Sequence, residues 1–281
     1  MRPRQWTKNL LLFAALVFAG QLFHASAFLT ACLAFAAFCL ASSSVYVVND
    51  VLDVERDRLH PEKRKRPVAS GRVSREAAIA LAAGLTAASL ALGFGIGRGF
   101  GITVVIYLAF SHFYSLVGKN VVILDIVLIA IGFVLRAVAG AEAIEVPFSN
   151  WFILCTFFVA LFIAISKRKA ELSASGDATG TRPVLAHYTR EALGTFTAAA
   201  MAAAVISYSL YVQDVLAKAG AQRRPLLFTV PFVILAIFRY YLLVERDAAG
   251  ERPEDVLLTD RPLQLCVLGF VVLAVAAFYG G

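Results

Sequence analysis

The chain is divided into long apolar blocks, and many of these reach the ~20 residues that a helix needs to cross a bilayer. Hydrophobic residues make up 60% of the 281 residues and charged residues only 16%, whereas a soluble domain is about half apolar and about a quarter charged. Inside lipid, each backbone N–H and C=O group must be satisfied within its own segment, so such blocks form helices. The regular alternation of membrane strands is missing from the sequence. We therefore predict an all-α, polytopic membrane bundle.

We expect about nine transmembrane helices, most of them joined by the short connections of a compact bundle. They run over residues 9–24, 27–47, 76–97, 100–117, 121–141, 150–166, 191–213, 225–243 and 263–279. The first is short, so we expect it to tilt or to begin at the membrane surface. Since no stretch between the blocks reads as a soluble domain, residues 1–281 are predicted to form a single membrane-embedded domain.

Basic residues are distributed unequally between the two ends of the predicted helices. Most of the 26 Lys and Arg residues fall on one side, chiefly at the N-terminus and in the long loops at about 49–75 and 167–190. The positive-inside rule places that side in the cytoplasm, with the N-terminus inside. We therefore expect a multi-pass protein of the bacterial cytoplasmic membrane whose working loops face the cytoplasm.

The net charge of +7 would suggest nucleic acid in a soluble protein. Here orientation and phosphate binding explain it better, so we expect the bilayer as a partner and no nucleic acid. The four cysteines lie singly inside apolar blocks, and this pattern favours buried packing over disulfides or a zinc site. The sequence does not indicate an oligomeric state.

The segment after the second predicted helix carries carboxylates at helical spacing. Asn49, Asp53 and Asp57 are four residues apart and so share one helical face, with Asp50 beside it. Stacked carboxylates repel one another unless a cation lies among them. Oxygen ligands alone favour Mg²⁺, with Mn²⁺ as the alternative. The spacing therefore predicts a metal site in this loop.

A run of basic residues follows the carboxylates, with Lys63, Arg64, Lys65 and Arg66 in succession. A metal and several cations together can neutralise the charge on a leaving pyrophosphate. The alternative is a solvated loop whose basic residues only set the membrane topology. The regular acidic spacing just before this basic run favours a diphosphate site over that alternative.

The segment NDVLDVERDRLHPEKRKRPVASG resembles the first aspartate-rich motif of the UbiA superfamily of intramembrane prenyltransferases. That resemblance implies a nine-helix fold with an active site open to the cytoplasm and laterally to lipid, and it covers nearly the whole chain. It also implies that Asn49, Asp50, Asp53 and Asp57 are catalytic and carry Mg²⁺. The expected direct metal ligands are Asn49, Asp53 and Asp57.

The sequence departs from the typical superfamily pattern after the sixth predicted helix. Where a second DxxxD motif is expected, the chain reads SKRKAE, which keeps the single carboxylate of Glu171 and adds Lys167, Arg168 and Lys169. A site that ionises a prenyl diphosphate between two acidic clusters would not have this composition. A site that binds additional phosphate groups would.

Four stretches, RPRQWTKN, the aspartate segment, KNVVILDIVLIAIGFVLRAVAG and SKRKAEL, are similar to the decaprenyl-phosphate phosphoribosyltransferase branch of that superfamily. This implies phosphoribosyl pyrophosphate as donor, a polyprenyl phosphate as acceptor, and a role in making the arabinose donor of the cell envelope. The implied reaction is displacement at the anomeric carbon, with positive charge developing on the ribose ring. The lipid phosphate is already an oxyanion, so no strong base is required.

Asp125 and Arg136 lie eleven residues apart in the fifth predicted helix, about three turns, and so share one face. An arginine inside the membrane usually faces the interior or a polar cavity. The alternative to a substrate role is a structural tie between Arg136 and Asp125 or Glu142.

Other polar residues near the cytoplasmic ends are weaker candidates. Lys119 is either topogenic or a phosphate ligand, and the resemblance favours the latter. Arg182 and Tyr188 lie in the second long loop. For each of them, the alternative to a role in substrate binding is a place in a solvated lid. His112 reads as a core histidine. The predicted substrate-binding residues are Lys8, Lys63, Arg64, Arg66, Tyr114, Lys119, Asp125, Arg136, Lys167, Arg168, Glu171 and Arg182.

Two other functions compete with phosphoribosyl transfer. One is a prenyltransferase that moves a prenyl group from a prenyl diphosphate to an aromatic acceptor, and the basic SKRKAEL segment argues against it. The other is a transporter or lipid-binding protein, since charges within the membrane occur there too. The sequence shows no inverted repeat or paired broken helices of the kind that transporters have.

Overall fold

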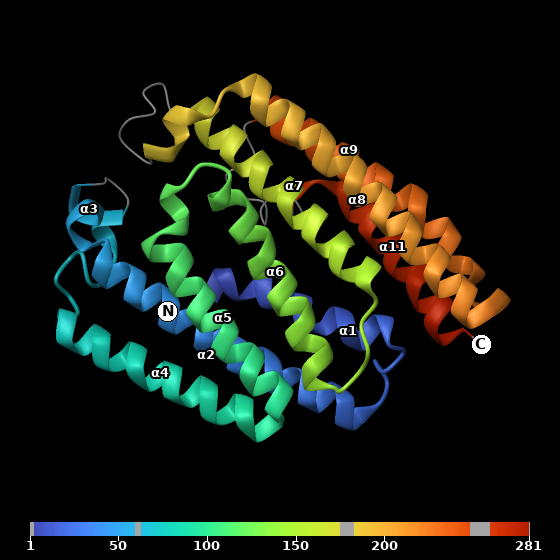
Figure 1. The fold of residues 1–281 in the computed structure, drawn as a ribbon, viewed down its shortest axis with the longest axis horizontal. Helices are drawn as coiled ribbons and strands as arrows, with labels where there is room; N and C mark the ends of the chain where they lie inside the picture. The colour runs from blue at the N-terminus through green and yellow to red at the C-terminus, as the bar shows by residue number, and fades with distance from the viewer. Residues whose placement is uncertain (1–2, 60–62, 175–182, 248–258, 281) are drawn as a thin grey trace. The chain divides into compact units, whose positions relative to one another are not determined.

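A computed structural model describes residues 3–59, 63–174, 183–247 and 259–280 of the chain, and the regular elements in these ranges are all helical (Figure 1). Within the described residues, eight helices are long and apolar enough to cross a membrane. They are α2 (Ala25–Leu52), α4 (Arg75–Ile96), α5 (Arg98–Leu116), α6 (Leu124–Ala143), α7 (Asn150–Ala174), α8 (Arg190–Ala219), α9 (Thr229–Asp247) and α11 (Arg261–Tyr279). The predicted all-α membrane fold is confirmed.

The structure differs from the prediction at the first expected helix. Residues 9–24 do not form one continuous α-helix, because a 3-10 segment, η1 (Pro3–Leu12), leads into the short helix α1 (Phe13–Phe18). Gly20 follows with a φ of 72°, a left-handed conformation that favours glycine and ends a helix. The segment therefore has less regular α-helix than its apolar length suggested.

The chain divides into two compact units. Unit 1 takes in Met1–Leu16, Leu22–Leu116 and Val138–Val146, and unit 2 takes in Val17–Gln21, Val117–Ala137 and Pro147–Gly281. The single domain expected from the sequence stays a prediction.

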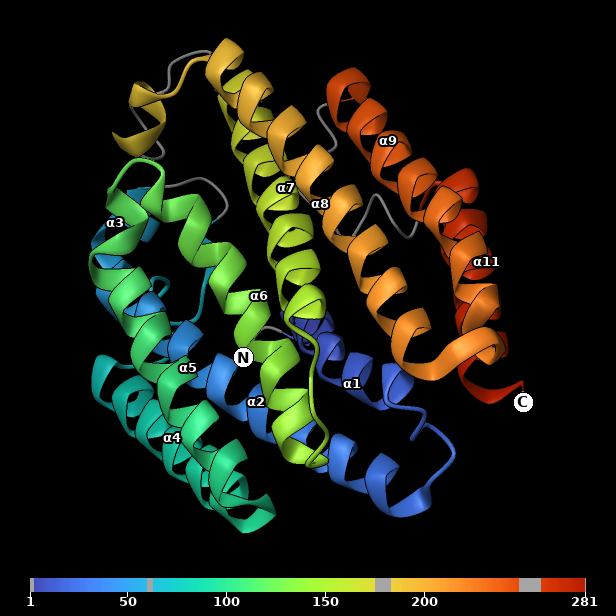
Figure 2. The same ribbon diagram turned by 45° about the vertical axis from the view of Figure 1, so that its right-hand side comes forward.

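In unit 1, α2 packs along α4 and also contacts α5 and η1 (Figures 1 and 2). Phe38 of α2 anchors this packing, with its ring centroid 4.9 Å from that of Tyr107 and 5.9 Å from that of Phe100. Beyond α2 come the short helices α3 (Val54–Leu59) and η2 (Lys63–Lys65). The side chain of Ser74 then accepts a hydrogen bond from the Ala77 N–H and caps α4. Two packed helices thus present the aspartate loop at the end of α2.

In unit 2, α7 packs along α8, and α9 packs along α11 (Figure 2). The short helices of this unit are η3 (Gly118–Asn120), η4 (Pro183–His187) and η5 (Gly220–Phe228). Buried side chains of α6, α7, α8 and α9 share one core cluster, which includes Ile126, Phe162, Ala204 and Tyr240. This core holds the first turn of α6 and the end of α7, where Asp125, Lys167, Arg168 and Glu171 of the predicted substrate-binding set lie.

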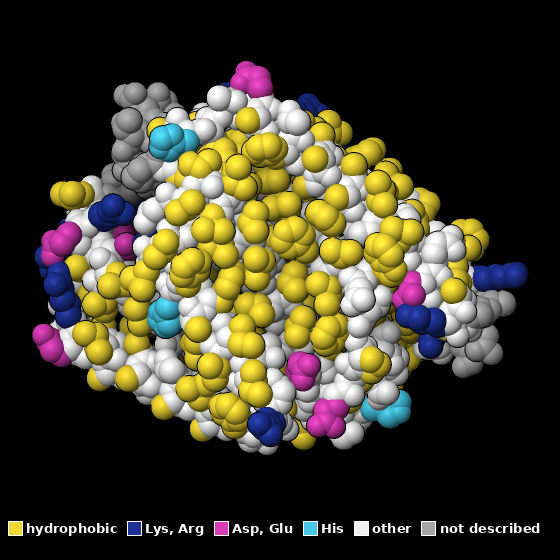
Figure 3. Space-filling model, in the orientation of Figure 1, with side chains coloured by type: hydrophobic (Ala, Val, Ile, Leu, Met, Phe, Trp, Pro, Cys, Tyr) yellow, Lys and Arg dark blue, Asp and Glu magenta, His cyan; other side chains and the backbone are white. Residues whose placement is uncertain are grey.

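Side-chain types are segregated along the helices of each unit. On the face drawn in Figure 3, hydrophobic side chains cover the middle of the helices, and Lys, Arg, Asp and Glu side chains gather near the helix ends. Many large apolar side chains are exposed, such as Leu29, Ile106 and Leu268 at 61%, 48% and 58%. This outward apolar surface is suited to lipid contact.

Gly140 gives a test of the packing in unit 1. A Cβ atom built there would collide with the backbone carbonyl of Leu12, whereas one at Gly84 of α4 would meet nothing within 4 Å. We expect Gly140→Ala to lower the melting temperature of the protein in detergent, with a loss of about 1–3 kcal/mol from overpacking. Gly84→Ala should be neutral or stabilising, because alanine is the better helix former. Equal melting temperatures for the two variants would contradict this packing.

Candidate metal and phosphate site

The aspartate loop continues the hydrogen-bond register of α2 across the helix end. The Asp53 N–H donates to the Asn49 carbonyl at 2.9 Å, and the Asp57 N–H donates to the Asp53 carbonyl at 2.8 Å. Asp53 is the C-cap of α2, and Asp57 lies in α3. The four-residue spacing predicted from the sequence is therefore present as a continuous backbone register.

Arg66 lies between two of these carboxylates. Its Nη1 atom is 2.6 Å from Asp57 Oδ2 and 3.3 Å from Asp50 Oδ1. The Asp57 side chain is only 4% exposed and that of Asp50 is 14% exposed. One guanidinium thus compensates two acidic groups that have little access to water.

The same cluster contains an acceptor that suits a cation. The side-chain oxygen of Asn49 is buried and has no hydrogen-bond donor, although buried polar atoms normally have one. No three His, Cys, Asp or Glu side chains among the described residues converge closely enough to hold a metal ion. Protein-bound Mg²⁺ usually needs only one or two carboxylates and completes its shell with water and substrate phosphates. The buried Asn49 oxygen and the carboxylates of Asp50 and Asp57 are of the type that Mg²⁺ takes, and the metal-ligand roles of Asn49, Asp53 and Asp57 stay predictions.

The basic part of the loop is folded back on itself. The Arg58 Nε atom donates to the Ala69 carbonyl at 3.3 Å, and Arg72 Nη2 donates to the Lys65 carbonyl at 2.7 Å. Arg75 pairs with Glu55 at 2.6 Å. Lys63 and Arg64 lie on η2, half-buried and exposed respectively. These contacts attach the basic segment to the loop that carries the aspartates, and the substrate-binding roles of Lys63 and Arg64 stay predictions.

The N-terminal segment is attached to α2 within the same unit. The indole N–H of Trp6 donates to Ser43 Oγ at 3.1 Å, and the buried amide of Asn9 donates to Ser42 Oγ at 3.3 Å. Lys8 lies between these anchors on η1 and is half-buried, and Tyr114 is half-buried near the end of α5. Unit 1 therefore contains Lys8, Lys63, Arg64, Arg66 and Tyr114 of the predicted substrate-binding set.

Unit 2 contains a buried charge network around Asp125. Arg168 Nε donates to Asp125 Oδ2 at 2.6 Å, and Arg168 Nη1 donates to Glu171 Oε2 at 2.7 Å. The side chains of Asp125 and Arg168 are 0% and 1% exposed. Arg168, predicted as a phosphate ligand, is thus buried and paired with two carboxylates.

Tyr188 completes this network. Its hydroxyl donates to Asp125 Oδ1 at 2.6 Å and accepts the Ile123 N–H at 2.7 Å. Burial, together with the hydrogen bond to Asp125, raises the pKa of Tyr188, so the phenol stays protonated and keeps donating. Ile123 has a φ of 69°, which is unusual for a β-branched residue. The tyrosine therefore joins the second long loop to the start of α6 instead of lying in a solvated lid.

These pairings were not evident from the sequence. Asp125 is 43 residues from Arg168 and 63 from Tyr188, so helical spacing carries no signal for either contact. The alternative partner weighed for Asp125 was Arg136. Arg136 instead donates to the Gly132 carbonyl at 2.7 Å and lies over the Phe133 ring. A substrate role for Arg136 stays a prediction.

The remaining predicted cations of unit 2 lie near the same helix ends. Lys119 lies on η3 and Lys167 on α7, and both are half-buried. Lys169 pairs with Glu245 at 2.6 Å, a contact between α7 and α9. Arg182 lies outside the described residues. The phosphate-binding roles of Lys119, Lys167 and Lys169 stay predictions.

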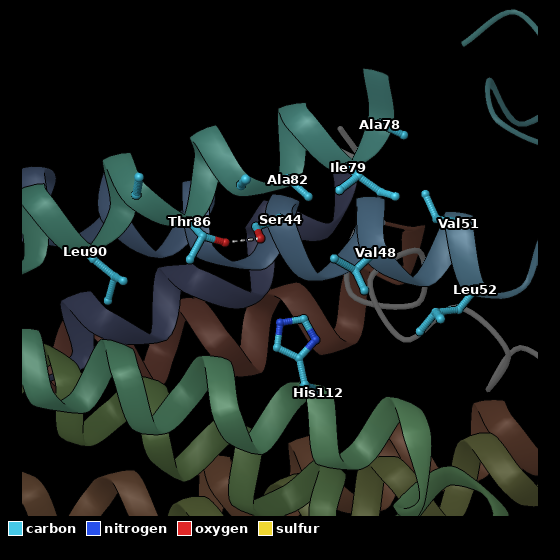
Figure 4. A pocket seen from close by; sticks show the side chains of 12 residues that line it. Ser44, Val48, Val51, Leu52, Ala78, Ile79, Ala82, Thr86, Leu90 and His112 are labelled. Carbon is cyan, nitrogen blue, oxygen red and sulfur yellow. Dashed lines mark hydrogen bonds between the residues drawn. The ribbon is translucent and has the colours of Figure 1, made fainter. Parts of the chain in front are cut away.

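A separate apolar pocket of about 630 Å³ lies in unit 1 between α2, α4 and α5. Figure 4 shows His112 pointing toward it from α5, and Ser44 and Thr86 joined across α2 and α4 by a hydrogen bond of 2.6 Å. Its lining contains no carboxylate, but it includes Val51 and Leu52, which lie between Asp50 and Asp53 in the aspartate segment. This apolar pocket therefore adjoins the candidate metal site, and His112 borders it instead of packing in the core.

Comparisons with known proteins agree with this architecture. The UbiA prenyltransferase family model matches residues 10–255. The chain is 37% identical to a decaprenyl-phosphate phosphoribosyltransferase of Mycolicibacterium smegmatis, over 99% of this chain and 91% of that protein. It is 38% identical to the enzyme of the same description from Corynebacterium glutamicum, over 99% and 85%. A solved UbiA homolog from Archaeoglobus fulgidus, bound to DMAPP and Mg²⁺, superimposes with a TM-score of 0.73 at 20% identity, over 99% of this chain and 96% of that one.

The buried network of unit 2 can be tested by thermal denaturation. Asp125→Asn removes the charge that faces Arg168, and breaking a buried ion pair from one side costs about 3–5 kcal/mol. We expect a large drop in melting temperature in detergent. The matched control is Asp214→Asn, whose partner Lys218 has a 71% exposed side chain and should contribute little. Similar melting temperatures for the two variants would show that the network carries little stability.

Proposed function

The chain belongs to the UbiA prenyltransferase family, and within that family we propose that it transfers a 5-phosphoribosyl group from phosphoribosyl pyrophosphate to a polyprenyl phosphate such as decaprenyl phosphate. The observation that carries this proposal is the similarity to decaprenyl-phosphate phosphoribosyltransferases along 99% of the chain. The replacement of the second acidic motif by Lys167, Arg168 and Lys169 supports it independently, since the two substrates bring three phosphate-bearing groups.

The aspartate loop is the proposed site of the pyrophosphate group. Asn49, Asp50 and Asp57 would hold Mg²⁺, with Asp53 as a further ligand, and Mn²⁺ is the alternative ion. When bound, the metal supplies positive charge that stabilises pyrophosphate as a leaving group. Arg66, with Lys63 and Arg64 on η2, would bind the diphosphate oxygens from the basic side of the loop, as arginine suits phosphate geometry.

The cations of unit 2 are proposed to bind the phosphates that the aspartate loop does not. Lys119 and Lys167 are the main candidates because they are half-buried near helix ends. Arg168 is enclosed by Asp125 and Glu171, so its proposed contribution is to hold this helix end in shape and to keep Glu171 oriented. Arg136, Tyr114, Lys8 and Arg182 remain further proposed substrate contacts.

The proposed reaction is a displacement at the anomeric carbon of the ribose. An oxygen of the lipid phosphate forms the new bond to C1 as the bond from C1 to the pyrophosphate oxygen breaks. The acceptor is already an oxyanion, so the protein needs to orient it without removing a proton. The products are polyprenyl-phosphoryl-5-phosphoribose and pyrophosphate.

The protein is a multi-pass membrane protein, and its orientation is part of the proposal. The excess of Lys and Arg in the loops that carry the site supports a cytoplasmic location for that side under the positive-inside rule. Phosphoribosyl pyrophosphate is a charged, water-soluble donor, which suits a site that opens to the cytoplasm of a bacterial cell.

The function is tested by the choice of donor. In detergent with Mg²⁺, we expect pyrophosphate release from phosphoribosyl pyrophosphate only when decaprenyl phosphate is present, with formation of the phosphoribosylated lipid. The comparison reaction combines a prenyl diphosphate with hydroxybenzoate. Turnover of that second pair, without turnover of the first, would instead establish the prenyltransferase alternative.

The loop's role is tested by paired charge-removing substitutions. We expect Asp53→Asn to reduce metal-dependent turnover by about 100-fold or more, as removal of a group that stabilises transition-state charge does. Glu55→Gln removes a charge two residues away, from a side chain that is 71% exposed, and should leave turnover near that of the unaltered protein. Full activity of the Asp53 variant would remove this residue from the mechanism.

A further inference from the structure

The guanidinium of Arg66 occupies a position in which a metal ion would also be attracted. Its Nη1 atom lies within hydrogen-bond distance of Asp57 Oδ2 and Asp50 Oδ1, so a single cationic group bridges two carboxylates from α2 and α3. A divalent cation bound by the same two oxygens would have to displace it. The side chain of Asn49, which precedes Asp50, adds a buried oxygen without a hydrogen-bond donor, so the segment has a further acceptor that Arg66 does not pair with.

We propose that Arg66 is a displaceable internal counter-ion, which keeps the affinity of the aspartate loop for bare metal low and moves to the diphosphate when metal and diphosphate bind together. This inference rests on the proposed metal and diphosphate site. It adds that the two ligands bind cooperatively, and that one side chain links them.

The local structure allows this exchange without refolding the loop. The Arg66 N–H donates to the Lys63 carbonyl at 2.9 Å, and the Arg66 carbonyl accepts the Ser70 N–H at 2.8 Å. The backbone on both sides of the side chain is therefore held in place. The side chain itself is 26% exposed, so rotation about its own bonds is enough to turn the guanidinium from the carboxylates toward an arriving phosphate.

The energetics favour exchange over simple loss of the ion pair. Asp57 is almost completely buried, and a buried carboxylate without a cation is strongly disfavoured. A metal ion replaces the lost charge, and a phosphate accepts the guanidinium in bidentate geometry. Because each ligand removes the obstacle to the other, each should raise the affinity for the other by the same factor.

The test measures metal binding directly, with Mn²⁺ as a paramagnetic probe and the full-length protein in detergent. Without pyrophosphate, we expect Arg66→Gln to bind Mn²⁺ about tenfold more tightly than the unaltered protein, because a charge-assisted hydrogen bond no longer competes. With Mn²⁺ at saturation, the same variant should bind inorganic pyrophosphate about tenfold more weakly. The cooperativity between the two ligands should accordingly fall.

Arg72→Gln is the matched control. It removes the same charge from the same loop, but Arg72 donates to the Lys65 carbonyl and to Ser70 instead of to the aspartates. We expect its Mn²⁺ affinity to stay within about twofold of the unaltered protein, because exposed charges are screened by solvent. Equal Mn²⁺ affinities for the Arg66 and Arg72 variants would overturn the proposal.

A stability measurement covers the case in which Arg66→Gln folds poorly. Without metal its melting temperature should fall below that of Arg72→Gln, and Mn²⁺ should restore it. If no folded Arg66→Gln protein is obtained even with Mn²⁺, the Mn²⁺ affinity of Arg66→Lys tests the proposal in its place. It keeps the charge but lacks the planar fork, so it should bind Mn²⁺ more tightly than the unaltered protein, and unchanged or weaker binding contradicts displacement. Turnover of phosphoribosyl pyrophosphate, measured separately, distinguishes failure of this inference from failure of the proposed function.

Discussion

A charge that is withdrawn from water requires a partner of opposite sign, and this requirement organises the polar parts of the molecule. Asp57 of unit 1 is paired with Arg66, and Arg168 of unit 2 is paired with Asp125. Since unpaired ionic groups are expensive in a low-dielectric setting, these contacts determine how the loops at the helix ends fold. The apolar helices supply the scaffold, and the ion pairs decide which loop residues attach to which helix.

The two pairings differ in how easily they can be exchanged. Arg66 is partly exposed and touches carboxylates that a metal could also use, so its contact suits a site that binds and releases ligands. Arg168 is enclosed on both sides by Asp125 and Glu171, with Tyr188 closing the network. A contact of this kind suits a permanent structural role. In the sequence, Lys167, Arg168 and Lys169 of α7 form one basic run. In the structure, Arg168 has a structural role, and the two lysines remain candidates for phosphate binding.

Hydrophobicity and charge distribution predicted most of the architecture, because the bilayer leaves helices as the main solution for a long apolar segment. The N-terminal region is the exception, since apolar length does not distinguish α1 and η1 from one continuous helix. The register of Asn49, Asp53 and Asp57 was also predictable, because local backbone hydrogen bonds set it. The contacts of Tyr188 with Ile123 and Asp125 were not predictable, because their separation along the chain leaves no periodic signal.

The amino-acid sequence was enough to predict the membrane class, the approximate bounds of eight long helices, the aspartate spacing and the resemblance to UbiA enzymes. These follow from local chemistry and from motifs that lie within one segment. Which charges neutralise one another became clear from the folded structure, in which Arg66 bridges Asp50 and Asp57, and Asp125 holds Arg168 instead of Arg136. Ion pairs depend on distances between side chains from different helices, and those distances are set by packing and not by sequence order.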